Sequence, residues 1–287
     1  MSYNIYTGLL KAFALPAAAK TATIFKHDHN HPKFNQLKTT YPIETTAGTS
    51  DDFTKAKNLL NWVSCHIYHK GNYSGSTSRN ALDLLNSAFN KGSEHGINCV
   101  CLSVILTECL LAIGIKAKTV FIMPCSPYDG DNHCVTQAYI TGINKWVMLD
   151  PTLNAYFTNQ QEDYLSLLEL RNCLANHEPV FFNKEAKYND DTWTDETAKD
   201  NIEYFAKNLF YFQTHETHTF YTFEAPSNRF ITLSPQGYDP KQVGLSNIDY
   251  RIKTYGDNPN MQAWKEGAEK EEFNFCSTAD FENPNPL

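Results

Sequence analysis

Cys99 stands at the head of an apolar stretch that predicts a buried helix. The residues from Val100 to Ile113 are mostly apolar, and Gly114 follows them as a natural helix stop. Residues 115–123 then read as a strand. A thiol at a helix N-terminus lies at the positive end of the helix dipole, which favours the thiolate over the thiol. Because the thiolate is the nucleophilic form, Cys99 is a candidate nucleophile for acyl transfer.

A histidine and an aspartate that could complete such a site follow in two predicted strands. His133 opens the first strand and Asp150 closes the second, with a turn around Thr141-Gly142 between them. If that turn is a two-residue loop, His133 and Asp150 lie directly opposite each other and share one face of the sheet. The carboxylate would then accept a hydrogen bond from one imidazole nitrogen and leave the other nitrogen for the thiol. A longer loop that includes Lys145 would shift this register.

Cys101 is the rival nucleophile, two residues further along the predicted helix. It would lie deeper in the helix, about 200° around the axis from Cys99. Both thiols could also be ordinary buried side chains, because free cysteine is commonly buried. The presence of His133 and Asp150 downstream favours a reactive thiol, and we expect Cys99 to be that thiol.

Three blocks of the sequence resemble the transglutaminase-like superfamily, whose core is papain-like, and in particular its bacterial members. The first block, residues 51–73, contains a Lys-Ala pair, Trp62-Val63 and, near its end, Ile67-Tyr68. The cysteine helix ends in Gly114-Ile115, and the second predicted strand ends in the string WVMLDPT. These blocks follow each other in the order of the family over roughly a hundred residues.

This resemblance implies an α+β fold, in which N-terminal helices and the helix of the nucleophile pack on an antiparallel sheet. It implies Cys99 as the reactive thiol, because that residue lies fifteen positions before Gly114, as in the family. His133 and Asp150 are implied as the other members of a catalytic triad.

The resemblance also implies where the oxyanion would be bound. The backbone N–H of Cys99 is one donor, and Tyr68 or Tyr73 is the candidate for the second. The sequence departs from the family at Ser103, where a small alanine is common. It departs again after His133, where other residues replace a small residue, Trp and Glu: Cys134, Val135 and Gln137.

The chemistry implied is acyl transfer from a peptide or carboxamide through a thioester on Cys99. We expect water to be the acceptor, as in a protease or amidase, because nothing in the sequence marks a tunnel for a lysine. A transglutaminase that cross-links protein glutamines is one alternative. A non-catalytic peptide- or protein-binding module that retains the fold is another. The sequence contains no Gly-rich phosphate loop, and we expect neither a cofactor nor a metal ion.

The composition sets outer limits on partners and compartment. The chain is 41% hydrophobic and 20% charged, with a net charge of −8, which argues against nucleic acid and anionic membranes as partners. We therefore expect a peptide or protein substrate, while the sequence leaves the oligomeric state open. The eight cysteines form no Cys-x-x-Cys pair, and the N-terminus lacks the pattern of a signal peptide. Both observations favour reduced thiols in a cytoplasmic protein.

The chain is expected to fall into three parts. Residues 1–50 form an N-terminal leader, and residues 51–160 form the catalytic core. Residues 161–287 form a helical connector and a β-rich extension that packs on the core as one domain.

Within this last part, residues 165–175 read as a helix. The aromatic stretches 203–214 and 250–255 read as strands, and a hairpin is expected from Thr219 to Ser234.

Two histidine-rich motifs could suggest a metal site. His27, His29 and His31 alternate in the string HDHNH, and this spacing lacks the paired ligands of a closed site, so we expect a solvated loop. The string HETH, residues 215–218, is not the H-E-x-x-H pattern because its histidines are three residues apart. It reads as a sheet edge or a turn.

Overall fold

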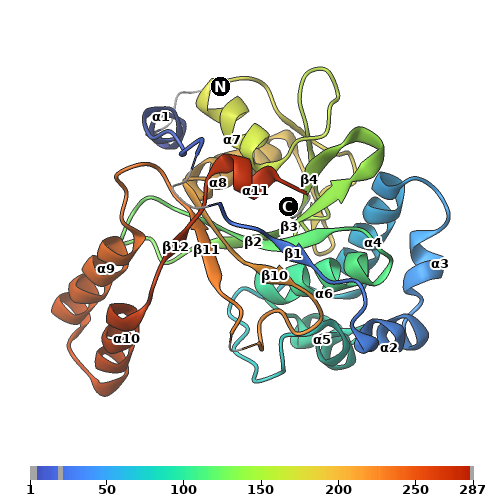
Figure 1. Ribbon diagram of the computed structural model, residues 1–287, viewed down its shortest axis with the longest axis horizontal. Helices are drawn as coiled ribbons and strands as arrows, with labels where there is room; N and C mark the ends of the chain where they lie inside the picture. Colours follow the sequence, from blue (N-terminus) through green and yellow to red (C-terminus); the bar gives the residue numbers. More distant parts are fainter. Residues whose placement is uncertain (1–4, 19–21, 226, 285–287) are drawn as a thin grey trace.

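The computed structural model describes residues 5–18, 22–225 and 227–284. A six-stranded sheet of order β12-β11-β9-β2-β3-β4 lies at the centre, with helices on both faces (Figure 1). The expected α+β class is confirmed. The helices are α1 (Ile5–Ala12), α2 (Pro32–Thr40), α3 (Ile43–Ala47), α4 (Asp52–His66), α5 (Ala81–Ala88), α6 (Cys99–Ala112), α7 (Leu167–Ala175), α8 (Asp195–Asn208), α9 (Pro240–Tyr255), α10 (Pro259–Lys270) and α11 (Thr278–Glu282), with short 3-10 turns η1 (Ser93–His95) and η2 (Thr141–Ile143).

The strands of the central sheet come from two distant parts of the chain. They are β2 (Ala117–Met123), β3 (His133–Ile140), β4 (Lys145–Leu149), β9 (Tyr211–His215), β11 (Phe230–Leu233) and β12 (Asn274–Phe275). Strand β2 pairs antiparallel with both β3 and β9, so the sheet continues from the predicted core into the C-terminal part. The division into leader, core and extension remains a prediction.

Short strands outside the central sheet form small two-stranded ribbons. They are β1 (Lys26–His27) with β10 (Thr217–His218), β5 (Phe157–Thr158) with β6 (Phe181–Phe182), and β7 (Lys187–Tyr188) with β8 (Asp191–Thr192).

The central sheet is buried on both faces because its strands alternate between two hydrophobic cores. In β4, Val147 and Leu149 pack with the core that α4, α5 and α6 share, whereas Met148 packs with the opposite core beneath α7 and α8. Successive side chains of a strand point to opposite faces, so both sets of helices gain apolar contact from one strand.

Helix α6 begins at Cys99, as expected, and is buried nearly all round. The side chain of Asn98 caps its first turn by accepting a hydrogen bond from the Cys101 N–H at 3.0 Å. Every residue from Cys101 to Ala112 is buried, which is typical of a helix that is apolar on all sides. Gly114 ends the run with a φ of +84°, a conformation that glycine adopts without strain.

The turn between β3 and β4 is longer than the two-residue loop that was expected. Ile140 pairs with Lys145, and the intervening turn ends at Asn144 with a left-handed φ of 53°. The predicted register, in which His133 lies directly opposite Asp150, is therefore wrong by two residues. Because strand side chains alternate with a period of two, this shift leaves both residues facing the same side of the sheet.

The C-terminal part contains more helix than was expected, so its predicted β-rich character is wrong. The helix expected at 165–175 is present as α7, and its capping box at Ser166 and Glu169 fixes the start. Much of the stretch 203–214, however, is the end of α8, and only its last residues enter β9. The stretch 250–255 is the end of α9.

The predicted hairpin from Thr219 to Ser234 is also wrong. Strand β11 pairs antiparallel with β9 instead, with Phe230 opposite His215. Helices α9 and α10 lie side by side and project from one end of the molecule (Figure 1). None of the helices within the described residues combines the length and apolar character needed to cross a membrane.

Candidate active site

The thiol of Cys99 occupies the first position of α6, at the positive end of the helix dipole. The side chain is partly exposed, whereas that of Cys101 is buried. The first N–H groups of a helix have no partner within the helix, so the backbone around Cys99 offers hydrogen-bond donors as well as partial positive charge.

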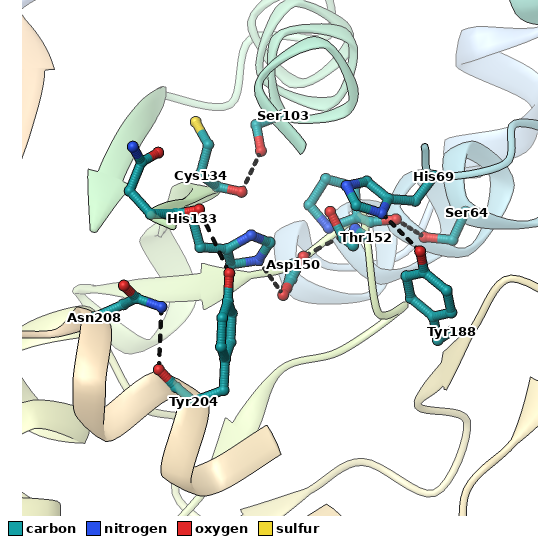
Figure 2. A network of polar contacts seen from close by, with 12 residues as sticks. Ser64, His69, Ser103, His133, Cys134, Asp150, Thr152, Tyr188, Tyr204 and Asn208 are labelled. Carbon is teal, nitrogen blue, oxygen red and sulfur yellow. Dashed lines mark hydrogen bonds and ion pairs between the residues drawn. The ribbon is translucent and has the colours of Figure 1, made fainter. Parts of the chain in front are cut away.

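His133 and Asp150 form a buried pair. The Nε2 atom of His133 lies 2.8 Å from Oδ2 of Asp150, and the two residues are 4% and 0% exposed. The other carboxylate oxygen of Asp150 accepts a hydrogen bond from the Thr152 N–H at 2.8 Å (Figure 2). The carboxylate is therefore fixed on both sides, and it leaves Nδ1 of the His133 ring for the thiol.

The electrostatics of this pair favour a thiolate beside an imidazolium. Burial opposes ionisation of Cys99, but hydrogen bonds and charges from His133 and His69 outweigh it and lower the pKa of the thiol to about 6. Burial would lower the pKa of His133, but the charge and hydrogen bond of Asp150, helped by Cys99, raise it to about 10. Burial raises the pKa of Cys101 to about 11, so that thiol stays protonated at neutral pH. These directions favour Cys99 over Cys101 as the nucleophile.

His69 lies beside the thiol, and the sequence alone indicated no catalytic role for it. The His69 ring, like the His133 ring, lies near enough to Cys99 to lower the pKa of its thiol. His69 follows α4 and pairs in a parallel bridge with Ile97, two residues before the thiol. This pairing depends on tertiary structure, so no local pattern at His69 could have indicated it.

The two tyrosines expected to bind the oxyanion make other contacts. Tyr68 donates its hydroxyl to the Asp190 carboxylate, and Tyr73 packs at the edge of the hydrophobic core. Their role as oxyanion donors stays a prediction, and these contacts do not favour it.

Helix α8 forms a wall beside His133 that the sequence also did not reveal. The Tyr204 ring lies edge-on to the His133 ring, with centroids 5.7 Å apart (Figure 2). The Phe205 ring lies edge-on to the same ring, with centroids 5.9 Å apart. Aromatic cover keeps water away from the His133–Asp150 pair and thereby strengthens its electrostatic interaction. This wall was missed because the aromatic residues of α8 read as a strand.

Polar side chains fix the elements that carry the triad. Ser103 of α6 donates to the Cys134 carbonyl at 2.9 Å, next to His133, and Ser64 of α4 donates to the Pro151 carbonyl at 2.7 Å, next to Asp150. The serine at position 103, where the family commonly has alanine, thus ties the nucleophile helix to the histidine strand.

Comparison with known proteins gives a family match over the residues that carry the site. Residues 39–151, less than half of the chain, match the family model of the transglutaminase-like superfamily. The resemblance inferred from the sequence blocks is confirmed. The matched residues include Cys99, His133 and Asp150, and the match supports cysteine-dependent chemistry of the papain-like kind.

Among solved structures, the chain is similar to a candidate cysteine protease from Cytophaga hutchinsonii. The sequence identity is 15% and the TM-score is 0.33, and the likeness covers 57% of this chain and 56% of that chain. This chain therefore spans little more than half the length of that protein. The search of the curated proteins gave no match.

Proposed function

We propose that the protein transfers an acyl group from a peptide or carboxamide bond to water through a thioester on Cys99. The observation that supports this most directly is the buried 2.8 Å contact between His133 and Asp150 beside the head of α6. A carboxylate that fixes one imidazole nitrogen while the other faces a thiol is the arrangement that activates a cysteine nucleophile.

In the first step, the Cys99 thiolate attacks the carbonyl carbon, and the carbonyl electron pair moves to oxygen. The oxyanion accepts hydrogen bonds from the backbone N–H of Cys99 and a second donor. The tetrahedral intermediate then collapses, the C–N bond breaks, and the His133 imidazolium gives its proton to the leaving amine. Water, deprotonated by neutral His133, attacks the resulting thioester and releases the acid and the thiol.

We infer water rather than a lysine amine as the acceptor because the sequence resembles peptidase-like members of the superfamily. The two acceptors leave different products from a glutamine-containing peptide. Hydrolysis releases ammonia without consuming an added amine, whereas cross-linking consumes the amine as ammonia appears.

Alkylation of Cys99 by iodoacetamide tests whether the thiol is activated. We expect fast labelling of Cys99 already at pH 7, located by peptide mass spectrometry, because its pKa is lowered. In the His133→Ala variant, Cys99 should react slowly at pH 7, because its thiol should then have the ordinary pKa of about 8.5. Cys101→Ser is the matched control and should label as fast as the wild type.

Slow labelling of Cys99 in the wild type, with the pH dependence of an ordinary thiol, would contradict the proposal. That result would favour a binding module that keeps the fold without the chemistry.

A further inference from the structure

His69 is held beside the nucleophile by its own backbone. The bridge between His69 and Ile97 is flanked by two backbone hydrogen bonds, from the Ile97 N–H to the Tyr68 carbonyl at 3.0 Å and from the Lys70 N–H to the Ile97 carbonyl at 2.8 Å. Because Ile97 leads directly into the cap of α6, this pairing holds the backbone of His69 close to the start of that helix.

A hairpin from far along the chain holds the same histidine. The turn between β7 and β8 places Asn189 in a left-handed conformation with a φ of 51°. The amide of Asn189 accepts from the His69 N–H at 2.7 Å and donates to the His69 carbonyl at 3.3 Å. The neighbouring Tyr188 hydroxyl lies 3.1 Å from Nδ1 of the His69 ring (Figure 2). This hairpin therefore contacts both the backbone and the ring of His69. It lies outside the residues that match the superfamily.

We propose that His69 is the side-chain donor of the oxyanion hole and that the β7–β8 hairpin positions it for this role. The inference rests on the proposed function, because an oxyanion forms only if Cys99 attacks a carbonyl. In the tautomer that this role requires, the Tyr188 hydroxyl donates to Nδ1 and the ring carries its proton on Nε2. That Nε2–H is the group free to point at the reacting carbonyl oxygen.

The partners of the two histidines separate their roles. His133 is backed by the Asp150 carboxylate, which stabilises an imidazolium and suits a general acid and base. His69 is backed by the Tyr188 phenol, which supplies no negative charge to stabilise an imidazolium. Tyr68, the earlier candidate, has its hydroxyl engaged by Asp190.

Two reactions of the same thiol test the proposal, because only one of them forms an oxyanion. With p-nitrophenyl acetate, the Cys99 thiolate attacks the ester carbonyl, an oxyanion forms, and the C–O bond breaks to release p-nitrophenolate. With iodoacetamide, the thiolate displaces iodide from a saturated carbon, and no oxyanion forms. The ratio of the two rate constants therefore isolates stabilisation of the oxyanion from activation of the thiol.

We expect His69→Ala to slow acylation by p-nitrophenyl acetate at least tenfold more than it slows alkylation, because its contribution to the low pKa of Cys99 affects both reactions alike. Loss of one oxyanion donor typically lowers rates by about 100- to 1000-fold with demanding substrates, and an activated ester needs less help. His69→Gln, which keeps an N–H donor, should restore part of the acylation rate. The exposed His95 provides the matched control as His95→Ala, and both of its rates should equal those of the wild type.

Equal acylation in His69→Ala and the wild type would overturn the inference. An equal loss in both reactions would also overturn it, because His69 would then act on the thiolate and not on the oxyanion. If wild-type acylation and alkylation are both slow and independent of His133, the proposed function itself fails and the inference fails with it.

Discussion

The buried carboxylate of Asp150 has two oxygen atoms with different partners. One oxygen accepts from the Thr152 backbone and the other contacts His133, each at 2.8 Å. The first contact fixes the direction of the carboxylate, and the second fixes the tautomer and the tilt of the ring. Its negative charge is also what raises the pKa of His133 against the effect of burial. Orientation and charge are therefore separable contributions of one residue.

Asp150→Asn keeps the shape of this side chain and removes its charge. Without the charge, burial dominates at His133, its pKa falls, and the imidazolium that stabilises the Cys99 thiolate is lost. The thiol should then ionise near the ordinary value of about 8.5 and not near about 6. The rate of alkylation of Cys99, measured from pH 5 to 9, should shift upward by more than one pH unit.

Asp131→Asn, an exposed carboxylate changed in the same way, is the control for that shift. A profile of Asp150→Asn that overlies the wild type would show that the charge of Asp150 does not set the ionisation of the thiol.

Residue type and local spacing were enough to predict Cys99, His133 and Asp150 as partners. Each marks the end of a helix or strand whose hydrophobic pattern is strong, so its position can be read locally. The contacts of His69 could not be predicted in this way. Its neighbours come from a bridge to Ile97 and from a hairpin about 120 residues downstream, and short sequence windows contain neither.

The nucleophile helix and the histidine strand are joined by hydroxyl groups as well as by apolar packing. Ser103 donates to the Cys134 carbonyl at 2.9 Å, and Thr136 donates back to the Ser103 carbonyl at 3.1 Å. Thr107 lies 3.2 Å from Thr136 one turn further along α6. Apolar contacts alone would let the helix slide along the sheet. The hydrogen bonds of these hydroxyl groups hold α6 at one position relative to β3. The separation of Cys99 and His133 is therefore set by the interface of two elements.

The β7–β8 hairpin can be tested as an element by changing one residue of its turn. Asn189→Gly keeps a backbone that readily adopts positive φ but removes both amide hydrogen bonds to His69. If the hairpin positions His69, acylation by p-nitrophenyl acetate should fall severalfold more than alkylation of Cys99. Asn90→Gly, at an exposed turn with a similar φ of 56°, is the matched control. Unchanged acylation in Asn189→Gly would mean that the bridge to Ile97 positions His69 without the hairpin.

Helices α8 and α9 show why the C-terminal elements were predicted wrongly. Their aromatic residues favour strands by propensity, but each helix has a strong start signal that propensity does not count. Thr194 caps α8 with Asp195 and Glu196 in its first turn, and Asp239 caps α9 ahead of Pro240. Capping and tertiary contact outweighed strand propensity, which is a weak preference.

At the level of the whole molecule, the N-terminal segment and the sheet meet at a cluster of histidines. Strand β1 pairs with β10, and the rings of His27 and His218 stack with centroids 5.3 Å apart. His215 lies nearby, and His218 is 0% exposed. The expectation of a solvated loop is wrong for His27, whose Nε2 is buried without a hydrogen-bond partner among the described residues. Burial lowers the pKa of His27 to about 3 and that of His215 to about 4, and it places that of His218 well below 6.5.

These pKa shifts predict that the histidine cluster stabilises the fold less in mild acid. A histidine whose pKa is lowered on folding is neutral in the folded state, so its contribution is fully present above the unfolded value of 6.5. As the pH falls below 6.5, the unfolded chain binds protons that the folded state excludes, and stability is lost through the window down to about pH 4. For His218 alone, the free energy of unfolding should fall by about 1 kcal/mol between pH 7.5 and 5.5.

Urea unfolding of the wild type and His218→Asn at these two pH values measures that contribution. The variant should be less stable at both values because it loses stacking with His27, but its change with pH should be smaller by about 1 kcal/mol. The change with pH is the informative quantity, since it does not depend on the absolute stability of either protein. His95→Asn, at an exposed site, should keep the full wild-type change. If His218→Asn loses as much stability as the wild type on acidification, His218 does not couple folding to protonation, and the acid sensitivity must come from other groups.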